Sequence, residues 1–215
     1  MGRVIEQVAL QEGHALFIAK TAPEHLLKDA DVCIDFSHAE CVKTHVLKAI
    51  HFQKPIIIGT TGFETDLPEI KTLVENSTIG ALFSPNFSLG IALFSHLLSL
   101  ADSLFSSFPI YEATGVEYHH KEKQDTPSGT AKKLSERMRG NVPFTSVRGG
   151  FFPGTHSIFF SSPVDTITLT HEARSREGFA KGALEAAKWM LDKKGWWTFD
   201  EMVGALYTAH HALQK

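Results

Sequence analysis

A short segment in mid-chain gathers residue types that can transfer protons and bind anions. The run from Glu117 to Ala131 reads EYHHKEKQDTPSGTA and contains two adjacent histidines. Because imidazole titrates near neutral pH, His119 or His120 could donate a proton, and Lys123 could bring a positive charge to an anionic ligand. Adjacent side chains of an extended chain point to opposite faces, so one histidine would face a substrate and the other a different partner.

The second half of this segment predicts the start of a helix. Pro127 suits the first helical position, with Asp125 or Thr126 as the cap. The backbone N–H groups that follow would point out of the helix start, where they can bind a carboxylate or phosphate. We therefore expect the amides of Ser128, Gly129 and Thr130 to bind an anion. The plainer alternative is a polar strand end followed by an ordinary helix start.

The twelve histidines are scattered along the chain. No group of cysteines or histidines has the spacing of a zinc site, so no metal is expected.

The elements that position this segment differ between the two halves of the chain. In the first half, short apolar runs alternate with helical periodicity, which is typical of buried strands and helices in a doubly wound parallel sheet. Ser37 and Glu40 form the pattern of a capping box before the second helix. The expected strands are Ala15–Ala19, Val32–Phe36, Pro55–Ile58 and Ile79–Phe83, and the expected helices are Val4–Ala9, Ala39–Phe52 and Leu67–Val74.

Beyond Asn86 the pattern changes. A long apolar helix, about Leu89 to Phe105, precedes several alternating strands. Strict alternation in Asp165–Thr170 indicates a sheet with one solvated face, to which Ser157–Phe160 would pair. Phe179–Leu191 predicts a helix that returns to the first domain.

These patterns predict an α/β protein with two domains. Residues 1–87 and 177–215 would form a Rossmann-like, doubly wound dinucleotide-binding domain. Residues 88–176 would form an α+β domain with a mixed or antiparallel sheet.

Bulk composition excludes several classes of protein. The 215 residues include 21 Lys+Arg and 24 Asp+Glu without a basic tract, so nucleic-acid binding is not expected. The longest apolar runs are interrupted by polar residues, so no membrane span is expected. Only Cys33 and Cys41 are present and no signal-peptide core is evident, which fits a cytoplasmic protein.

Two predicted strands end in polar, turn-forming residues. Gly59-Thr60-Thr61 follows one strand and Ser84-Pro85-Asn86-Phe87 follows another. In a doubly wound sheet, ligands bind beyond the carboxyl ends of the strands, where glycine allows close backbone approach and hydroxyl or amide groups form hydrogen bonds. Ordinary turns would give the same pattern.

At these residues the chain resembles a known family, dihydrodipicolinate reductase, also called 4-hydroxy-tetrahydrodipicolinate reductase, of lysine and diaminopimelate biosynthesis. The family signature E-x-H-H-x-x-K-x-D-x-P-S-G-T-A is matched from Glu117 to Ala131. The resemblance continues in Gly59–Phe63, in Asn86–Ser88 with Gly90, and in Arg176–Gly182, and it extends over residues 1 to about 190.

The resemblance implies an oxidoreductase that transfers a hydride from NADPH or NADH to a cyclic imine bearing two carboxylates, which gives tetrahydrodipicolinate. His119 would donate a proton or position the substrate, and Lys123 would support protonation and bind a carboxylate. His120, Gly129 and Thr130 would hold the dicarboxylate. The family also implies a homotetramer assembled through the sheet of the second domain.

The resemblance further implies cofactor contacts in the first domain. A lysine at position 20 would favour NADPH, or it is simply a solvated charge. The expected contacts are Gly59, Thr60, Thr61, Ser84, Pro85, Asn86, Phe87, Lys20, Arg176 and Phe179.

The start of the chain departs from the family pattern. The family opens with a strand and a glycine-rich loop of the form G-x-x-G-x-x-G, of which Met1-Gly2-Arg3 matches only the last residues. The intact downstream sequence favours a start assigned at an internal methionine over a true truncation. Two other functions stay open: another amino-acid dehydrogenase of the same architecture, and a non-catalytic relative that binds the dicarboxylate or serves as an oligomer partner.

Overall fold

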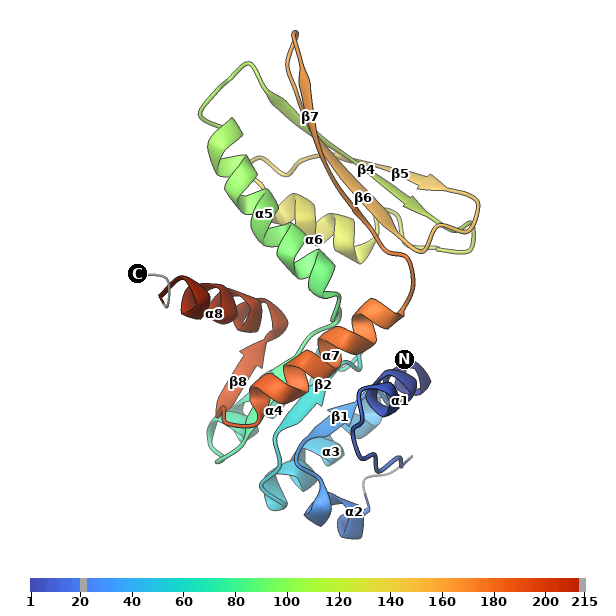
Figure 1. The fold of residues 1–215 in the computed structure, drawn as a ribbon, viewed down its shortest axis with the longest axis vertical. Coiled ribbons are helices and arrows are strands. Elements are labelled where there is room, and N and C mark those ends of the chain that lie inside the picture. Colours follow the sequence, from blue (N-terminus) through green and yellow to red (C-terminus); the bar gives the residue numbers. More distant parts are fainter. Residues whose placement is uncertain (20–22, 213–215) are drawn as a thin grey trace. The chain divides into compact units, whose positions relative to one another are not determined.

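The computed structural model describes residues 1–19 and 23–212. The chain forms two compact units, shown as a ribbon in Figure 1. Unit 1 comprises Met1–Leu89 together with the segment that starts at Arg176, and unit 2 comprises Gly90–Ser175. Each unit is built around its own sheet of four strands.

The sheet of unit 1 is entirely parallel. Its strands are β1 (Cys33–Asp35), β2 (Ile56–Ile58), β3 (Gly80–Phe83) and β8 (Gly195–Thr198), in the order β1-β2-β3-β8. All three residues of β2 are buried, because a strand covered by helices on both faces needs apolar side chains in both directions.

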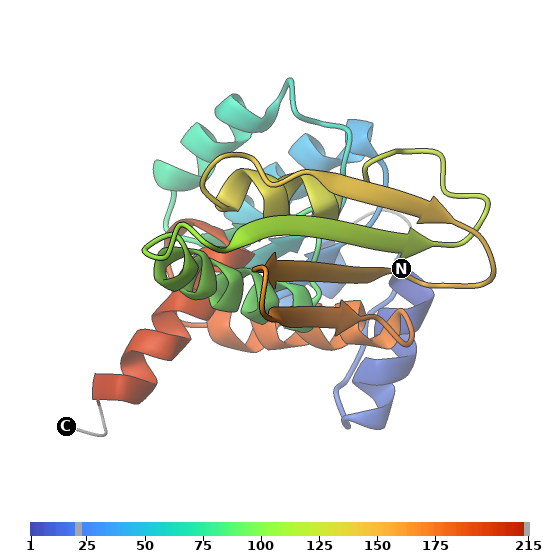
Figure 2. The ribbon, with the colours of Figure 1, turned by 90° about the horizontal axis from the view of Figure 1, so that it is seen from above.

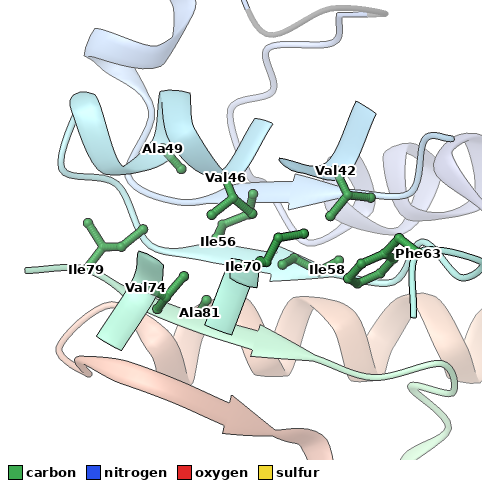
Figure 3. Close-up of a cluster of buried hydrophobic side chains, with 10 residues drawn as sticks. All are labelled: Val42, Val46, Ala49, Ile56, Ile58, Phe63, Ile70, Val74, Ile79 and Ala81. Carbon is green, nitrogen blue, oxygen red and sulfur yellow. The ribbon is translucent and has the colours of Figure 1, made fainter. Parts of the chain in front are cut away.

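Helices cover this sheet on both faces. Ile56 and Ile58 of β2 pack with Val46 of α3 and Ile70 of α4, as Figure 3 shows. Ile57 alternates with them and points to the other face, and α7 also packs against β2. The helices of unit 1 are α1 (Gly2–Gln11), α2 (Glu24–Asp29), α3 (Ala39–His51), α4 (Leu67–Glu75), α7 (Glu177–Met190) and α8 (Phe199–Ala212).

The sheet of unit 2 is mixed. Its strands are β4 (Glu112–His119), β5 (Phe144–Arg148), β6 (Thr155–Ser161) and β7 (Thr166–Glu172), in the order β5-β4-β6-β7 seen in Figure 2. Strand β4 runs parallel to β5 and antiparallel to β6, which is antiparallel to β7.

Two helices supply the core of unit 2. They are α5 (Leu89–Phe105) and α6 (Gly129–Arg137). Leu98 of α5 and Leu134 of α6 pack with Ile158 of β6 in one buried cluster. The predicted α/β class is therefore confirmed: a Rossmann-like parallel sheet with helices, and a second unit with a mixed sheet.

Two local predictions about the first unit are wrong. Ala15–Ala19 is not a strand, because it pairs with no strand in the part of the chain that the structure describes. The apolar residues Leu16, Phe17 and Ile18 instead line a cavity of about 480 Å³ beside β1. The capping box is also not formed, since His38 caps α3 without a side-chain hydrogen bond. The backbone N–H of Ser37 donates to Asp35 and Thr60.

A membrane span was not expected. Over the residues that the structure describes, none of the helices combines the length and the apolar character needed to cross a lipid bilayer.

Candidate active site

Strand pairing brings polar side chains of unit 2 around one carboxylate. In the register of the sheet, Glu117 of β4 lies opposite Ser146 of β5 and His156 of β6. His119 follows two residues later on the same face and lies opposite Arg148. We call these residues, together with Ser128 before α6, the Glu117 cluster: Glu117, His119, Ser128, Ser146, Arg148 and His156.

The carboxylate of Glu117 is fully buried and ionised. Its Oε1 accepts hydrogen bonds from the backbone N–H of Ser128 (2.9 Å), the hydroxyl of Ser146 (2.6 Å) and Nη2 of Arg148 (2.8 Å). Burial opposes ionisation, but the hydrogen bonds from Ser128, Ser146 and Arg148 together outweigh it and lower the pKa of Glu117 to about 2. A negative charge therefore stands at the centre of the cluster at neutral pH.

The other oxygen of Glu117 faces two imidazoles. Oε2 lies 3.3 Å from Nδ1 of His119 and 3.6 Å from Nε2 of His156, and it has no hydrogen-bond partner among the described residues. The 3.6 Å separation from His156 is too long for a hydrogen bond, and the contact with His119 does not form one either, so both contacts are electrostatic. The side chain of His156 is also within 3.3 Å of the Ser128 hydroxyl.

Three atoms of this cluster could hold a metal ion. One ligand atom each from Glu117, His119 and His156 lies within 4.8 Å of the others, and all three residues are buried. The charge balance disfavours this, because Arg148 already compensates Glu117 and a dication would add two uncompensated buried charges. Sequence spacing could not reveal the group, since His156 lies 37 positions beyond His119.

Burial lowers the pKa of both clustered histidines. Burial lowers the pKa of His156 to about 4, so this imidazole is neutral at physiological pH. Burial also lowers the pKa of His119, whereas the charge of Glu117 raises it and the charges of Lys123 and Arg148 lower it. The charges of Glu117 and Lys123 therefore act in opposite directions on His119.

The start of α6 differs from its prediction. Ser128, not Asp125 or Thr126, is the cap: its side chain accepts from the backbone N–H of Ala131, and the helix begins at Gly129 rather than at Pro127. The reason is that the backbone N–H of Ser128 is bound by the buried Glu117. The helix start is therefore fixed from within unit 2.

At this helix start, groups of the predicted anion site already bind a carboxylate of the same chain. The backbone N–H of Gly129 donates to Oδ2 of Asp125 (3.2 Å), and Nζ of Lys123 lies 2.7 Å from Oδ1. The side chain of Lys123 lowers the pKa of the exposed Asp125 carboxyl. A carboxylate thus already occupies the place where the sequence predicted a ligand carboxylate.

The remaining predicted substrate residues lie on the same segment. His119 is 6% exposed, whereas His120 is exposed at the end of β4, as alternation predicts. The backbone N–H of Lys123 donates to the carbonyl of His120 in a tight turn. Thr130 is half-buried in the first turn of α6. The structure therefore brings His119, Lys123 and Gly129 to one corner of unit 2.

In unit 1, two predicted cofactor segments meet at the carboxyl ends of adjacent strands. The backbone N–H of Ser84, after β3, donates to the carbonyl of Ile58 at the end of β2. Gly59 has no room for a side chain, because a Cβ there would overlap the ring of Phe36. A cavity of about 290 Å³ opens at this edge, lined in part by Ser37 and by Gly59-Thr60-Thr61.

One buried carboxylate organises this edge. Oδ1 of Asp35 accepts from the hydroxyl of Thr60 (3.0 Å) and from the backbone N–H of Ser37, while Oδ2 lies 2.9 Å from Nδ1 of His45. Asp35 and His45 received no role from the sequence, although Asp35 lies next to the end of the predicted strand Val32–Phe36, where ligand-binding residues are expected. Thr61, in contrast, is exposed.

The second cofactor segment forms a self-bonded turn. The hydroxyl of Ser84 donates to the carbonyl of Asn86 (2.7 Å) and accepts from its backbone N–H, and Pro85 is exposed. Phe87 is 1% exposed and packs against the rings of Phe36 and Phe199. The ring of Phe87 therefore supports the turn from inside the unit.

The last predicted cofactor residues begin α7. Arg176 is the exposed cap residue and Phe179 is half-buried one turn later. Because α7 leads directly into β8, which is parallel to β3, the helix starts at the edge where the strands end. Arg176 and Phe179 thus share an edge with the two turns. Lys20 lies outside the described residues.

Taken with its two sheets, the molecule is a Rossmann-like α/β protein that carries an α+β unit with an acid–base cluster. Family profiles described as dihydrodipicolinate reductase, N-terminus, and dihydrodipicolinate reductase, C-terminus, match residues 1–87 and 90–203. The chain therefore belongs to the dihydrodipicolinate reductase family, and it is an oxidoreductase.

Individual relatives agree with this family. The 4-hydroxy-tetrahydrodipicolinate reductase of Zymomonas mobilis is 34% identical over 240 residues, which cover 95% of this chain and 93% of the relative. That of Rickettsia bellii is 37% identical over 79% of this chain and 73% of the relative. The dipicolinate-bound dihydrodipicolinate reductase from Paenisporosarcina sp. TG-14 has the same fold, with a TM-score of 0.69, 24% identity and coverage of 79% of this chain and 72% of that one.

Proposed function

We propose that this chain reduces 4-hydroxy-tetrahydrodipicolinate, or dihydrodipicolinate, to tetrahydrodipicolinate with NADPH or NADH, in lysine and diaminopimelate biosynthesis. The observation that carries the proposal is the corner of unit 2 where His119, Lys123 and the start of α6 meet. In a member of this family, such a corner supplies a proton donor and a site for a carboxylate.

Each residue of the corner has a proposed role. His119 donates a proton to the reduced ring, and Lys123 supports that step and binds one carboxylate. His120, with the backbone groups of Gly129 and Thr130, holds the dicarboxylate. The Paenisporosarcina reductase binds dipicolinate, a planar dicarboxylate, which supports a ligand of this class.

The edge of unit 1 fits a nicotinamide cofactor. The 290 Å³ cavity at this edge is lined in part by Gly59 and by the hydroxyl-bearing residues Ser37, Thr60 and Thr61. When bound, the cofactor supplies the hydride. Gly59-Thr60-Thr61, Ser84-Pro85-Asn86-Phe87, Arg176 and Phe179 would hold it, and Lys20 would favour NADPH.

The proposed binding roles divide the chain into two domains. Residues 1–87 and 177–215 would bind the cofactor, and residues 88–176 would bind the substrate and assemble a homotetramer in the cytoplasm. Strand β7, whose residues alternate between exposed and half-buried, offers a surface for assembly. Light scattering after gel filtration would report a mass near four chains.

The first test is the replacement His119→Gln. Loss of a general acid costs about 10²- to 10⁴-fold in rate, so kcat should fall by at least about a hundredfold while the Kd of NADPH stays unchanged. The exposed replacement Lys133→Gln is the matched control and should leave both unchanged. An unaltered kcat in His119→Gln would contradict the proposed donor role.

Calorimetry separates the reductase from a non-catalytic relative. We expect NADPH and pyridine-2,6-dicarboxylate to bind together, each tightening the other. Binding of the dicarboxylate without NADPH would contradict a working reductase and favour a relative that only binds dicarboxylates. A panel of amino-acid substrates would reveal a different dehydrogenase.

A further inference from the structure

Glu117 lies at the centre of the cluster beside the proposed proton donor His119, and its two oxygens have different surroundings. Oε1 is saturated by three donors, from Ser128, Ser146 and Arg148. Oε2 has no hydrogen bond within the described chain, yet it lies closest to Nδ1 of His119 and Nε2 of His156. One oxygen holds the scaffold and the other faces the imidazoles.

The charge of Glu117 matters because everything else around His119 disfavours its protonated form. Burial is the largest influence on its pKa and lowers it; Lys123 from the following loop and Arg148 from β5 lower it further. His156 of β6 is neutral at physiological pH, and the exposed Asp125 favours protonation less than Glu117 does. Glu117 is therefore the main group that favours an imidazolium at His119.

We propose that Glu117 is the positioning residue of the reductase: the charge at Oε2, 3.3 Å from Nδ1 of His119, keeps that imidazole able to carry a proton, while Oε1 fixes Arg148 and the start of α6. The proposal rests on the role of His119 as proton donor. It assigns Glu117 an effect on proton transfer that a purely structural anchor would not have.

Because Oε1 accepts hydrogen bonds and Oε2 faces His119, the two oxygens of Glu117 can be tested with different variants. Glu117→Gln keeps the shape and an acceptor oxygen but removes the charge that faces His119. Ser146→Ala removes one hydrogen bond to Oε1 and leaves the charge at Oε2 in place. A structural role predicts similar effects from both variants, whereas a positioning role predicts that only Glu117→Gln changes His119.

The first measurement is the titration of His119 by NMR, with its signal assigned by comparison with His119→Gln. In Glu117→Gln we expect the pKa of His119 to fall by at least about one unit, which is a tenfold change in proton affinity. Ser146→Ala should leave that titration unchanged, and Glu117→Asp, which restores the charge, should recover part of the shift. An unchanged pKa of His119 in folded Glu117→Gln would overturn the proposal.

The second measurement is the pH profile of kcat. On one side of this profile kcat falls with rising pH because the proton donor loses its proton. That limb should move to lower pH by the same amount as the pKa of His119, with about a tenfold loss of kcat at neutral pH. If the NMR titration shifts and the profile does not, the donor role of His119 is wrong and the catalytic part of the proposal is overturned with it.

A second variant serves as the control for destabilisation of the fold. Glu117→Gln leaves Arg148 as a buried charge without its partner, which is destabilising. The double variant Glu117→Gln/Arg148→Gln removes both charges. Because Glu117 influences the pKa of His119 more than Arg148 does, the pKa should still fall, and a rise or no change would overturn the proposal.

Discussion

The Glu117 cluster of unit 2 and the strand-end edge of unit 1 are built in different ways. The cluster joins side chains from three strands around one ionised carboxylate. The edge is formed by two turns, in which backbone groups, hydroxyls and a glycine without room for a Cβ define the surface. The cluster combines several buried ionisable groups, whereas the edge combines one buried carboxylate, Asp35, with closely packed turns.

This difference predicts which changes each site tolerates. A backbone surface fails when a side chain is added, because neighbouring main-chain atoms cannot move aside. A charged cluster fails when a charge is removed or a proton is added, because the remaining buried groups lose their compensation. Substitutions that add a side chain should therefore disrupt the edge of unit 1. Acid pH, or substitutions that remove a charge without changing the shape, should disrupt the cluster of unit 2.

The largest effect should come from Gly182→Ala in α7. A Cβ at Gly182 would overlap the carbonyl oxygen of Phe87 and contact the ring of Phe199, so α7 or the turn after β3 must shift. Overpacking costs about 1–3 kcal/mol or more, and here the obstacle is backbone. We expect a fall in Tm of at least about 5 °C and loss of NADPH binding.

Gly178→Ala in the same helix is the matched control. A Cβ there meets nothing within 4 Å, so the change should be neutral or stabilising by up to about 1 kcal/mol. Equal melting temperatures for the two variants would show that close packing does not shape the cofactor edge.

Acid should weaken unit 2 through His156. Burial lowers its pKa from 6.5 to about 4, so between these values the unfolded chain binds a proton that the folded chain does not. Stability should therefore fall as the pH drops from about 6.5 to about 4, by up to about 3 kcal/mol. Glu117, with its pKa lowered from 4.5 to about 2, loses its contribution in a second window between those two values.

Urea unfolding at a series of pH values measures this effect. His156→Gln removes the imidazole, so the slope of the unfolding free energy between pH 6.5 and 4 should be shallower than in the unmodified chain. The difference between the two slopes isolates His156 from other histidines such as His171, whose pKa burial also lowers. Identical slopes would argue against a neutral His156 in the folded cluster.

The sequence predicted features that depend on neighbouring residues. The bounds of α5, Leu89–Phe105, and the pairing of Ser157–Phe160 with the strand that follows were both predicted correctly, because local periodicity determines them. The strand expected at Ala15–Ala19 was wrong, because an apolar run becomes a strand only if another strand pairs with it.

Features that depend on distant residues were not predictable from spacing. The motif identified His119 and Lys123, but Glu117 received no role because its donors are distributed over the chain. Arg148 and His156 reach it only through the register of β5 and β6, which no local pattern reveals. The predicted cap of α6 was wrong for the same reason: the group that binds the backbone N–H of Ser128 is 11 residues upstream.

A smaller effect is expected from a substitution at Thr60, and it should distinguish the cofactor edge of unit 1 from the substrate site of unit 2. Thr60→Val keeps the shape but removes the hydroxyl that donates to Asp35, and a hydrogen bond to a charged acceptor contributes about 1.5–3 kcal/mol. Ser37 and His45 still hold Asp35, so we expect the low end of that range. By calorimetry the Kd of NADPH should rise up to about tenfold while that of pyridine-2,6-dicarboxylate is unchanged. An equal loss for both ligands would contradict two separately built sites.

The smallest predicted effect is a gain of affinity at Asp125. This carboxylate is bound by Lys123 and the backbone N–H of Gly129, the groups proposed to bind the substrate, so a ligand carboxylate must displace it. An exposed ion pair contributes about 0.2–1 kcal/mol, so Asp125→Asn should tighten binding of pyridine-2,6-dicarboxylate up to about fivefold. Glu122→Gln, an equal charge change on an exposed residue of the same loop, controls for the general loss of negative charge. If both variants tighten binding equally, the gain comes from the net charge of the loop, and competition by Asp125 for Lys123 is excluded.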